Sequence, residues 1–145
     1  MTDDAHHAEL EARYPIGEKQ PESVRTRSGR PLADLSLDNL LAGDVTAADF
    51  GITAEGLREQ AEIAQAAGRP SLARNLRRGA EIVAIPDETL LAIYELLRPG
   101  RAESADELRA AAQDLRRAYG AEAMAQLIEE AATVYERRRF FQRRY

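Results

Sequence analysis

The sequence contains no cysteine and no tryptophan, and its only histidines are His6 and His7. The lack of cysteine excludes disulfide bonds, cysteine-ligated zinc, iron–sulfur clusters and thiolate nucleophiles. Both imidazoles lie at the extreme N-terminus, so a histidine-based triad, proton relay or metal site elsewhere in the chain is excluded as well. Adjacent residues point about 100° apart on a helix, and we interpret this histidine pair as solvated.

Long hydrophobic runs and phosphate-binding loops are also missing. No stretch approaches the roughly 18 consecutive apolar residues of a membrane span, and the N-terminal region lacks the apolar core of a signal peptide. Neither common glycine-rich nucleotide-binding pattern, G-x-x-x-x-G-K-[ST] or G-x-G-x-x-G, occurs. We therefore expect a cytoplasmic protein that has no membrane partner.

The apolar residues that are present suffice for one core. Of the 145 residues, 44% are hydrophobic and 31% are charged, and the formal net charge is -5. A domain of about 150 residues buries roughly 70% of the surface that its unfolded chain exposes, and it can fold without covalent cross-links. Lys19 is the only lysine, and every other basic residue is an arginine. Arginine favours ion pairs and interfaces, although a GC-rich genome produces the same bias.

The chain divides by composition near residue 35. Residues 1–14 are polar and are compatible with one or two helical turns or with a mobile tail. The density of proline and glycine in residues 15–31 excludes a long helix and predicts an irregular arm that lies on the domain or on a partner chain. We predict an N-terminal tail and arm at residues 1–35 and a helical domain at residues 36–145.

From residue 36 onward, segments with helical periodicity are each bounded by start and stop signals. The predicted starts are Ser36, Thr46, Thr53, Pro70, Asp87, Ser104 and Ala121. The predicted stops are Gly43, Gly51, Gly68, Pro86, Pro99 and Gly120. No run alternates β-branched and aromatic residues as a strand would. The predicted fold class is all-α, an open bundle of several helices with an irregular N-terminal arm.

The segment after Asp87 carries more apolar residues than one narrow stripe can hold. These residues are Leu90, Leu91, Ile93, Tyr94, Leu96 and Leu97. Because a helix that is apolar over most of its surface is usually buried, we predict that this segment is covered on more than one side. The carboxylates nearby, Glu81, Asp87 and Glu88, lie in an apolar context where a pKa could shift. We assign Asp87 to the N-cap and Glu88 to the first helical turn, where carboxylates are favoured.

Arginines cluster on the segment that starts at Pro70. Arg74, Arg77 and Arg78 have the spacing of neighbours on one helix face, and Asn75 is adjacent to them. We call these three arginines the arginine ridge. Clustered arginines repel one another unless acids pair with them. Three interpretations stay open: a solvated face, pairing with acids of a neighbouring helix or partner chain, and a phosphate-binding face.

The C-terminus combines arginine with aromatic side chains. Residues 137–145 contain five arginines, with Phe140, Phe141 and Tyr145 among them. Such a segment could stack on bases, anchor on an anionic surface or pack against another subunit. A small helical nucleic-acid-binding or regulatory protein that uses the arginine clusters is therefore one functional hypothesis.

Several blocks of the sequence, read in order between about Tyr14 and Arg138, resemble the small subunit of adenosylcobalamin-dependent diol and glycerol dehydratases. The blocks are YP at 14–15, SGRPL at 28–32, DLSL at 34–37, LAGDV at 41–45, QAEIA at 60–64, LARNLRRGAEIVAIPDE at 72–88 and IYELLRPGR at 93–101. The block at 72–88 and the loop at 98–101 are the most specific. Gly79 stands where alanine is usual, which costs about 1 kcal/mol unless a neighbour packs closely there.

The resemblance implies one chain of a heteromeric hydro-lyase that converts 1,2-propanediol or glycerol into an aldehyde and water. It places the substrate in a barrel of the large subunit and adenosylcobalamin between the large and medium subunits. Such a barrel needs about 250 residues, more than this chain has. The resemblance implies two copies of each chain in the assembly. It implies no catalytic, cofactor-binding or metal-binding residue on this one.

The small subunit is then expected to dock on the large subunit and to stabilise it, without binding nucleic acid. The N-terminal arm and the Pro86–Asp87 corner join the arginine ridge as contact regions. The candidate interface residues are Arg74, Asn75, Arg77, Arg78, Pro86, Asp87, Tyr94, Arg98 and Arg101. The resemblance places the protein in the cytoplasm or inside a bacterial microcompartment, with residues 1–14 as a candidate targeting helix.

Overall fold

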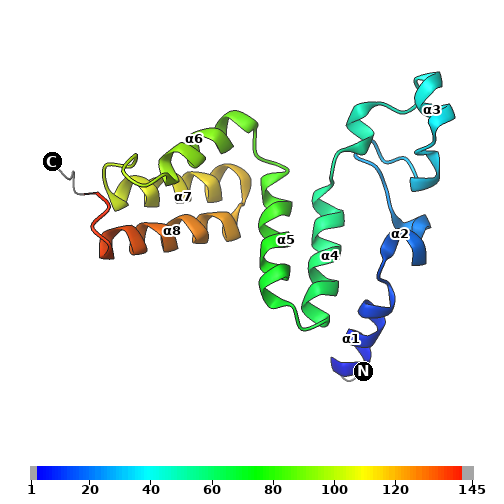
Figure 1. Ribbon diagram of the computed structural model, residues 1–145, viewed down its shortest axis with the longest axis horizontal. Coiled ribbons are helices and arrows are strands. Elements are labelled where there is room, and N and C mark those ends of the chain that lie inside the picture. The colour runs from blue at the N-terminus through cyan, green and yellow to red at the C-terminus, as the bar shows by residue number, and fades with distance from the viewer. Residues whose placement is uncertain (1–2, 142–145) are drawn as a thin grey trace. The chain divides into compact units, whose positions relative to one another are not determined.

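The computed structural model describes residues 3–141, and the all-α prediction is confirmed for them. The α-helices are α1 (Asp3–Ala12), α2 (Ile16–Lys19), α3 (Leu37–Ala42), α4 (Ala54–Ala66), α5 (Pro70–Ile82), α6 (Asp87–Leu97), α7 (Ala105–Tyr119) and α8 (Glu122–Arg137) (Figure 1). Three 3-10 helices are η1 (Pro21–Ser23), η2 (Leu32–Asp34) and η3 (Ala47–Phe50). Within this part of the chain the β-structure is a single isolated bridge between Arg25 and Pro31.

The chain forms two compact units, residues 1–80 and residues 81–145. The boundary falls near the C-terminal end of α5. The division predicted near residue 35 rests on composition rather than on packing, and it stays a prediction. Each unit is described by itself below.

The first unit is built around the pair α4 and α5, which lie side by side (Figure 1). Its buried cluster consists of Ala61, Ala64 and Ala73, with Leu76 packed against it. A Cβ at Gly79 would lie 3.4 Å from Leu57 Cδ1, so α4 and α5 approach closely there. This close packing is the condition under which a glycine in mid-helix is compensated.

The N-terminal residues of the first unit form a helix rather than a mobile tail. Helix α1 lies beside α4. Just after α1, the Arg13 guanidinium forms an ion pair with Glu59 of α4. The arm that follows has only the short elements α2, η1 and η2, as its prolines and glycines predicted. It is anchored at Thr26, which is buried.

The predicted caps of the first unit are confirmed in their geometry. The Ser36 hydroxyl accepts a hydrogen bond from the Asn39 N–H at 3.2 Å, and Gly43 ends α3 with a φ of +80°. Thr53 accepts from the Gly56 N–H at 3.1 Å at the start of α4. These contacts satisfy N–H groups that a helix leaves free at its first turn, and the positive φ is accessible to glycine without strain.

The second unit has a larger core, in which α7 and α8 pack along each other and α6 contributes one side (Figure 1). The buried side chains are Ile85, Ile93, Ala102, Ala105, Leu108, Ala112, Leu115, Ala121, Met124, Ala125, Ile128 and Ala132. Ser104 starts α7 by accepting from the Glu107 N–H, and Gly120 ends it with a φ of +62°. The sequence signals for this hairpin were therefore correct.

Two predictions about α6 are wrong. Its N-cap is Pro86 rather than Asp87, and Asp87 is the first helical residue. The helix is also not covered on more than one side within this chain, because Leu91 and Tyr94 are exposed while Ile93 is buried. The fixed φ of proline suits the start of a helix, which shifts the boundary by one residue. The excess apolar residues of α6 remain available to solvent in the isolated chain.

The aromatic residues at the end of α8 pack on their own unit. The Phe140 and Phe141 rings lie 5.2 Å and 6.1 Å from the Tyr135 ring, centroid to centroid. The Tyr135 hydroxyl donates to the Leu97 carbonyl, and Tyr135 and Phe141 pack against the core. Phe140 and Phe141 thus have partners within their own unit, which none of the three interpretations of this segment included, while Tyr145 lies outside the described residues.

Candidate subunit interface

The arginine ridge lies on α5 within the first unit. Arg74 and Arg77 are exposed and Arg78 is half-buried. Their polar contacts are short-range: Arg74 donates to Ser71 Oγ at 3.3 Å, and Arg78 donates to Asn75 Oδ1 at 3.4 Å. In the described part of the chain, none of the three forms an ion pair with a carboxylate. Among these residues the ridge is therefore not paired with an acid of a neighbouring helix, and the solvated, partner-binding and phosphate-binding interpretations stay open.

Arginines of the second unit behave differently. Arg116 is bound by two carboxylates, with Nη1 at 2.5 Å from Glu129 and Nε at 2.9 Å from Glu122. These hydrogen bonds, first from Glu129 and then from Glu122, raise the pKa of Arg116. Arg109 likewise contacts Glu136 at 2.6 Å, and the hydrogen bond to Glu136 raises the pKa of Arg109. Such paired arginines already have their partners and are poor candidates for an external contact.

The remaining candidate residues belong to the second unit and lie in α6 or next to its ends. Pro86, Asp87 and Tyr94 are exposed. Arg98 contacts both Glu95 oxygens, at 2.9 and 3.1 Å, and Arg101 approaches the same carboxylate at 3.7 Å. Arg98 and Arg101 therefore carry less unpaired charge than the arginine ridge. Tyr94 offers an exposed aromatic ring of the kind that is enriched at interfaces.

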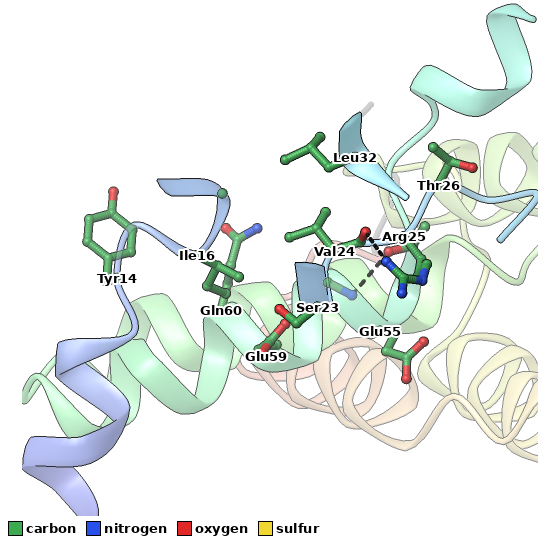
Figure 2. Close-up of a pocket in the computed structure, with 13 residues that line it drawn as sticks. Tyr14, Ile16, Ser23, Val24, Arg25, Thr26, Leu32, Glu55, Glu59 and Gln60 are labelled. Carbon is green, nitrogen blue, oxygen red and sulfur yellow. Dashed lines mark hydrogen bonds between the residues drawn. The ribbon is translucent and has the colours of Figure 1, made fainter. Parts of the chain in front are cut away.

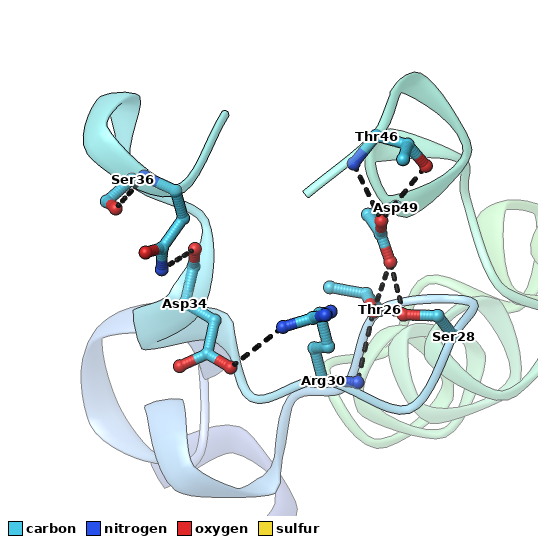
Figure 3. A network of polar contacts seen from close by, with 8 residues as sticks. Thr26, Ser28, Arg30, Asp34, Ser36, Thr46 and Asp49 are labelled. Carbon is cyan, nitrogen blue, oxygen red and sulfur yellow. Dashed lines mark hydrogen bonds and ion pairs between the residues drawn. The ribbon is translucent and has the colours of Figure 1, made fainter. Parts of the chain in front are cut away.

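A buried carboxylate holds the arm of the first unit to η3 (Figure 3). Asp49 Oδ1 accepts hydrogen bonds from the Thr26 hydroxyl at 3.0 Å and from the Ser28 hydroxyl. Asp49 Oδ2 accepts from the Thr46 N–H at 3.0 Å and from the Thr46 hydroxyl at 3.2 Å. These bonds, led by the one from Ser28, lower the pKa of Asp49 to about 2. The sequence predicted a helix start at Thr46, but not the bonds of Asp49 to Thr26 and Ser28.

Glu81 is a second carboxylate with a structural role. The sequence marked it as a carboxylate in an apolar context but did not predict its partners. The Glu81 carboxylate accepts from the Ala123 N–H at 2.9 Å and the Met124 N–H at 2.8 Å. These are free donors of the first turn of α8, whose own N-cap Ala121 has no side-chain cap. Glu81 therefore caps a helix more than forty residues away, and the sequence holds no local signal for this pairing.

A cavity of the first unit lies between the arm and α4 (Figure 2). It has a volume of about 480 Å³, and its labelled walls include Tyr14, Val24 and Leu32 from the arm and Glu59 from α4. Glu59 is already paired with Arg13. In the described residues every buried side-chain nitrogen or oxygen has a hydrogen-bond partner.

The histidine pair does not fit a cobalamin or metal site. His6 and His7 are exposed on α1 and line a shallow hollow of about 320 Å³, which is too small to enclose a corrinoid. Among the described residues, no three His, Asp or Glu side chains gather as metal ligands would. No helix of the described part is both long and apolar enough to cross a membrane.

Comparison with known proteins distinguishes between the two functional hypotheses. A model of the dehydratase small-subunit family matches residues 10–142, which is most of the chain. The chain belongs to the dehydratase small-subunit family. A propanediol dehydratase small subunit from Citrobacter freundii is 47% identical over 135 residues, covering 93% of this chain and 77% of the relative. The same subunit from Salmonella typhimurium strain LT2 is 46% identical over 126 residues, covering 87% and 72%.

The block at residues 72–88, which is the most specific part of the family resemblance, lies on two helices of the structure. Residues 72–88 run along α5 and into the first turn of α6. The block thus carries the arginine ridge and also Glu81, which caps α8. The comparisons support the dehydratase hypothesis and give no support to the nucleic-acid-binding alternative. The structure divides the nine candidate residues between the two units, with Arg74, Asn75, Arg77 and Arg78 in the first.

Proposed function

We propose that this chain is the small, non-catalytic subunit of a heteromeric adenosylcobalamin-dependent diol dehydratase. The enzyme converts 1,2-propanediol or glycerol into an aldehyde and water. The observation that carries the proposal is the 47% identity over 135 residues to a propanediol dehydratase small subunit. The chain's role is to dock on the large subunit and stabilise it, because radical chemistry needs a rigid site that excludes water.

The assembly contains large, medium and small subunits, with two copies of each. Adenosylcobalamin supplies the radical chemistry and is held by the other subunits. The donor set of this chain agrees with that placement, since its two imidazoles are exposed on α1. The site of action is the cytoplasm or the interior of a bacterial microcompartment, with residues 1–14 as a candidate targeting helix.

The arginine ridge is the first contact to test. Without carboxylate partners in the described chain, its guanidinium groups can form bidentate ion pairs with acids of the large subunit. We expect the triple variant Arg74→Ala, Arg77→Ala and Arg78→Ala to weaken assembly at least about tenfold, because charge pairs buried in an interface carry a large penalty when one partner is lost.

The measurement is co-purification with a tagged large subunit in the presence of the medium subunit, followed by titration of the assembled enzyme with cobalamin. Arg117→Ala is the matched control, since Arg117 is exposed and pairs only with Asp114 in its own helix. Undiminished assembly of the triple variant would remove the ridge from the interface. A changed cobalamin affinity in the assembled enzyme would contradict the non-catalytic role.

A further inference from the structure

Helix α3 exposes its apolar side to solvent. Leu37, Leu40 and Leu41 have the i, i+3, i+4 spacing of one helix face. Their exposed fractions are 68%, 42% and 78%, and no residue of α3 is buried. We call these three side chains the leucine face. A helix of six residues does not persist in water through its own hydrogen bonds, so something other than a core holds it.

Polar contacts at both ends hold α3 in place. Ser36 caps the first turn, and Gly43 adopts the left-handed conformation that ends the helix. The Asn39 side chain donates to the Asp34 carbonyl at 2.9 Å (Figure 3). The backbone is therefore fixed before any partner binds, and the leucine face is presented at little entropic cost on association.

The segment that carries the leucine face has acidic residues and no basic ones. Residues 31–57 contain no lysine or arginine, and their acidic residues are Asp34, Asp38, Asp44, Asp49 and Glu55. Asp49 is used internally and Asp34 lies 3.9 Å from Arg30. Asp38 and Asp44, both exposed, flank the leucine face in sequence. An apolar surface with an acidic rim fits an apolar groove that has a basic rim.

We propose that the leucine face inserts into an apolar groove on the large dehydratase subunit, an inference that rests on the proposed function. Lysine or arginine side chains at the rim of that groove contact Asp38 and Asp44. A second copy of this chain is a poorer fit. A symmetric contact through the same patch would bring the acidic rims together with no basic residue of that segment between them. The arginine ridge needs an acidic surface, so two contacts of opposite charge would fix the orientation of the small subunit.

The test compares Leu41→Asp with Ala42→Asp. Both residues are exposed and lie in the last turn of α3, but Ala42 lies about 100° from Leu41 around the helix, off the leucine face. Each variant is co-expressed with the medium subunit and a tagged large subunit. We expect Leu41→Asp to be retained at least about tenfold less tightly, and Ala42→Asp to be retained like the wild type. Unchanged melting of both isolated variants shows that α3 is intact.

Equal retention of Leu41→Asp and the wild type would overturn the inference while leaving the proposed function standing. Failure of the wild-type chain to be retained at all would instead contradict the proposed function, and the inference with it. Light scattering on the isolated chain adds a second check. A dimer that Leu41→Asp converts into a monomer would show that a second copy, and not the large subunit, covers the leucine face.

Discussion

The two units of this protein are stabilised in different ways. The second unit buries large side chains, with Leu108, Leu115 and Ile128 almost wholly inaccessible to solvent. The packed cluster of the first unit consists of alanines, and the large buried apolar side chains of this unit are Val45, Leu57 and Ile63. The first unit also exposes most of the large apolar side chains that the described chain leaves in solvent. These are Tyr14, Leu37, Leu40, Leu41, Phe50, Ile52 and Leu72. Among the described residues, the first unit therefore leaves more of its large apolar side chains uncovered than the second unit does.

The polar groups show the same contrast. In the second unit, arginines such as Arg109 and Arg116 pair with carboxylates of their own hairpin. In the first unit, Arg13 pairs with Glu59, but within the described residues the arginine ridge has no carboxylate partner, while a buried carboxylate, Asp49, fixes the arm. The arginine ridge is therefore the cluster of arginines whose charge the described chain does not neutralise by ion pairs.

The largest expected effect is on the core of the second unit. Leu108 is 0% exposed, so Leu108→Ala creates a cavity and should lower the free energy of unfolding by about 2–5 kcal/mol. Leu41→Ala, the same truncation at a side chain of the first unit that is 78% exposed, should change it by less than about 0.5 kcal/mol. Urea unfolding of the isolated chain measures both. Equal losses of unfolding free energy in Leu108→Ala and Leu41→Ala would show that the two units do not differ in packing at these positions.

A second prediction concerns acid. Because the pKa of Asp49 is about 2 in the folded chain against 3.8 in an unfolded one, its stabilising effect is fully present above about pH 4 and is lost as the pH falls toward 2. The wild type should melt at a higher temperature than Asp49→Asn at pH 5, and the gap should narrow between pH 4 and pH 2. Asp38→Asn, at an exposed carboxyl of the same unit, is the control. A gap that does not change with pH would show that the network is not held by the carboxylate charge.

The smallest expected effect separates the two groups of arginines. Arg116→Ala leaves Glu122 and Glu129 without their partner and should slightly lower the melting temperature of the isolated chain at low salt, less so at high salt. Arg74→Ala should leave that temperature unchanged, since Arg74 contacts only Ser71. Differential scanning calorimetry at two salt concentrations measures the melting temperatures of both variants. A larger loss for Arg74→Ala would mean that the arginine ridge stabilises the chain itself.

Much of the fold could be predicted from the sequence because helix ends are local events. Ser36, Thr53 and Ser104 each accept a hydrogen bond from the backbone three residues later, which depends only on neighbours in the chain. Gly43 and Gly120 adopt a positive φ for an equally local reason. Two helix ends were placed incorrectly: Asp87 follows a proline that takes the capping position itself, and α5 ends at Ile82 rather than at Pro86.

The candidate interface was less predictable because it depends on which side chains the fold leaves uncovered. The sequence marks the arginine ridge, but not that its charges lack partners within the described chain. The apolar excess of α6 was read as burial, whereas Leu91 and Tyr94 are exposed. The sequence left the contacts of Phe140 and Phe141 open, and the structure shows that both rings pack on Tyr135. Exposure follows from packing between distant segments, which periodicity does not encode.

By itself, the sequence determined the all-α class, most helix boundaries and the family, because these depend on local capping, on periodicity and on blocks of residues that can be compared directly. Only the tertiary structure showed that Glu81 caps α8, that Asp49 binds the arm and that the leucine face of α3 stays exposed. Each of these depends on contacts, or on their absence, between residues far apart in the chain. Such contacts form only when the folded backbone brings the partners within reach.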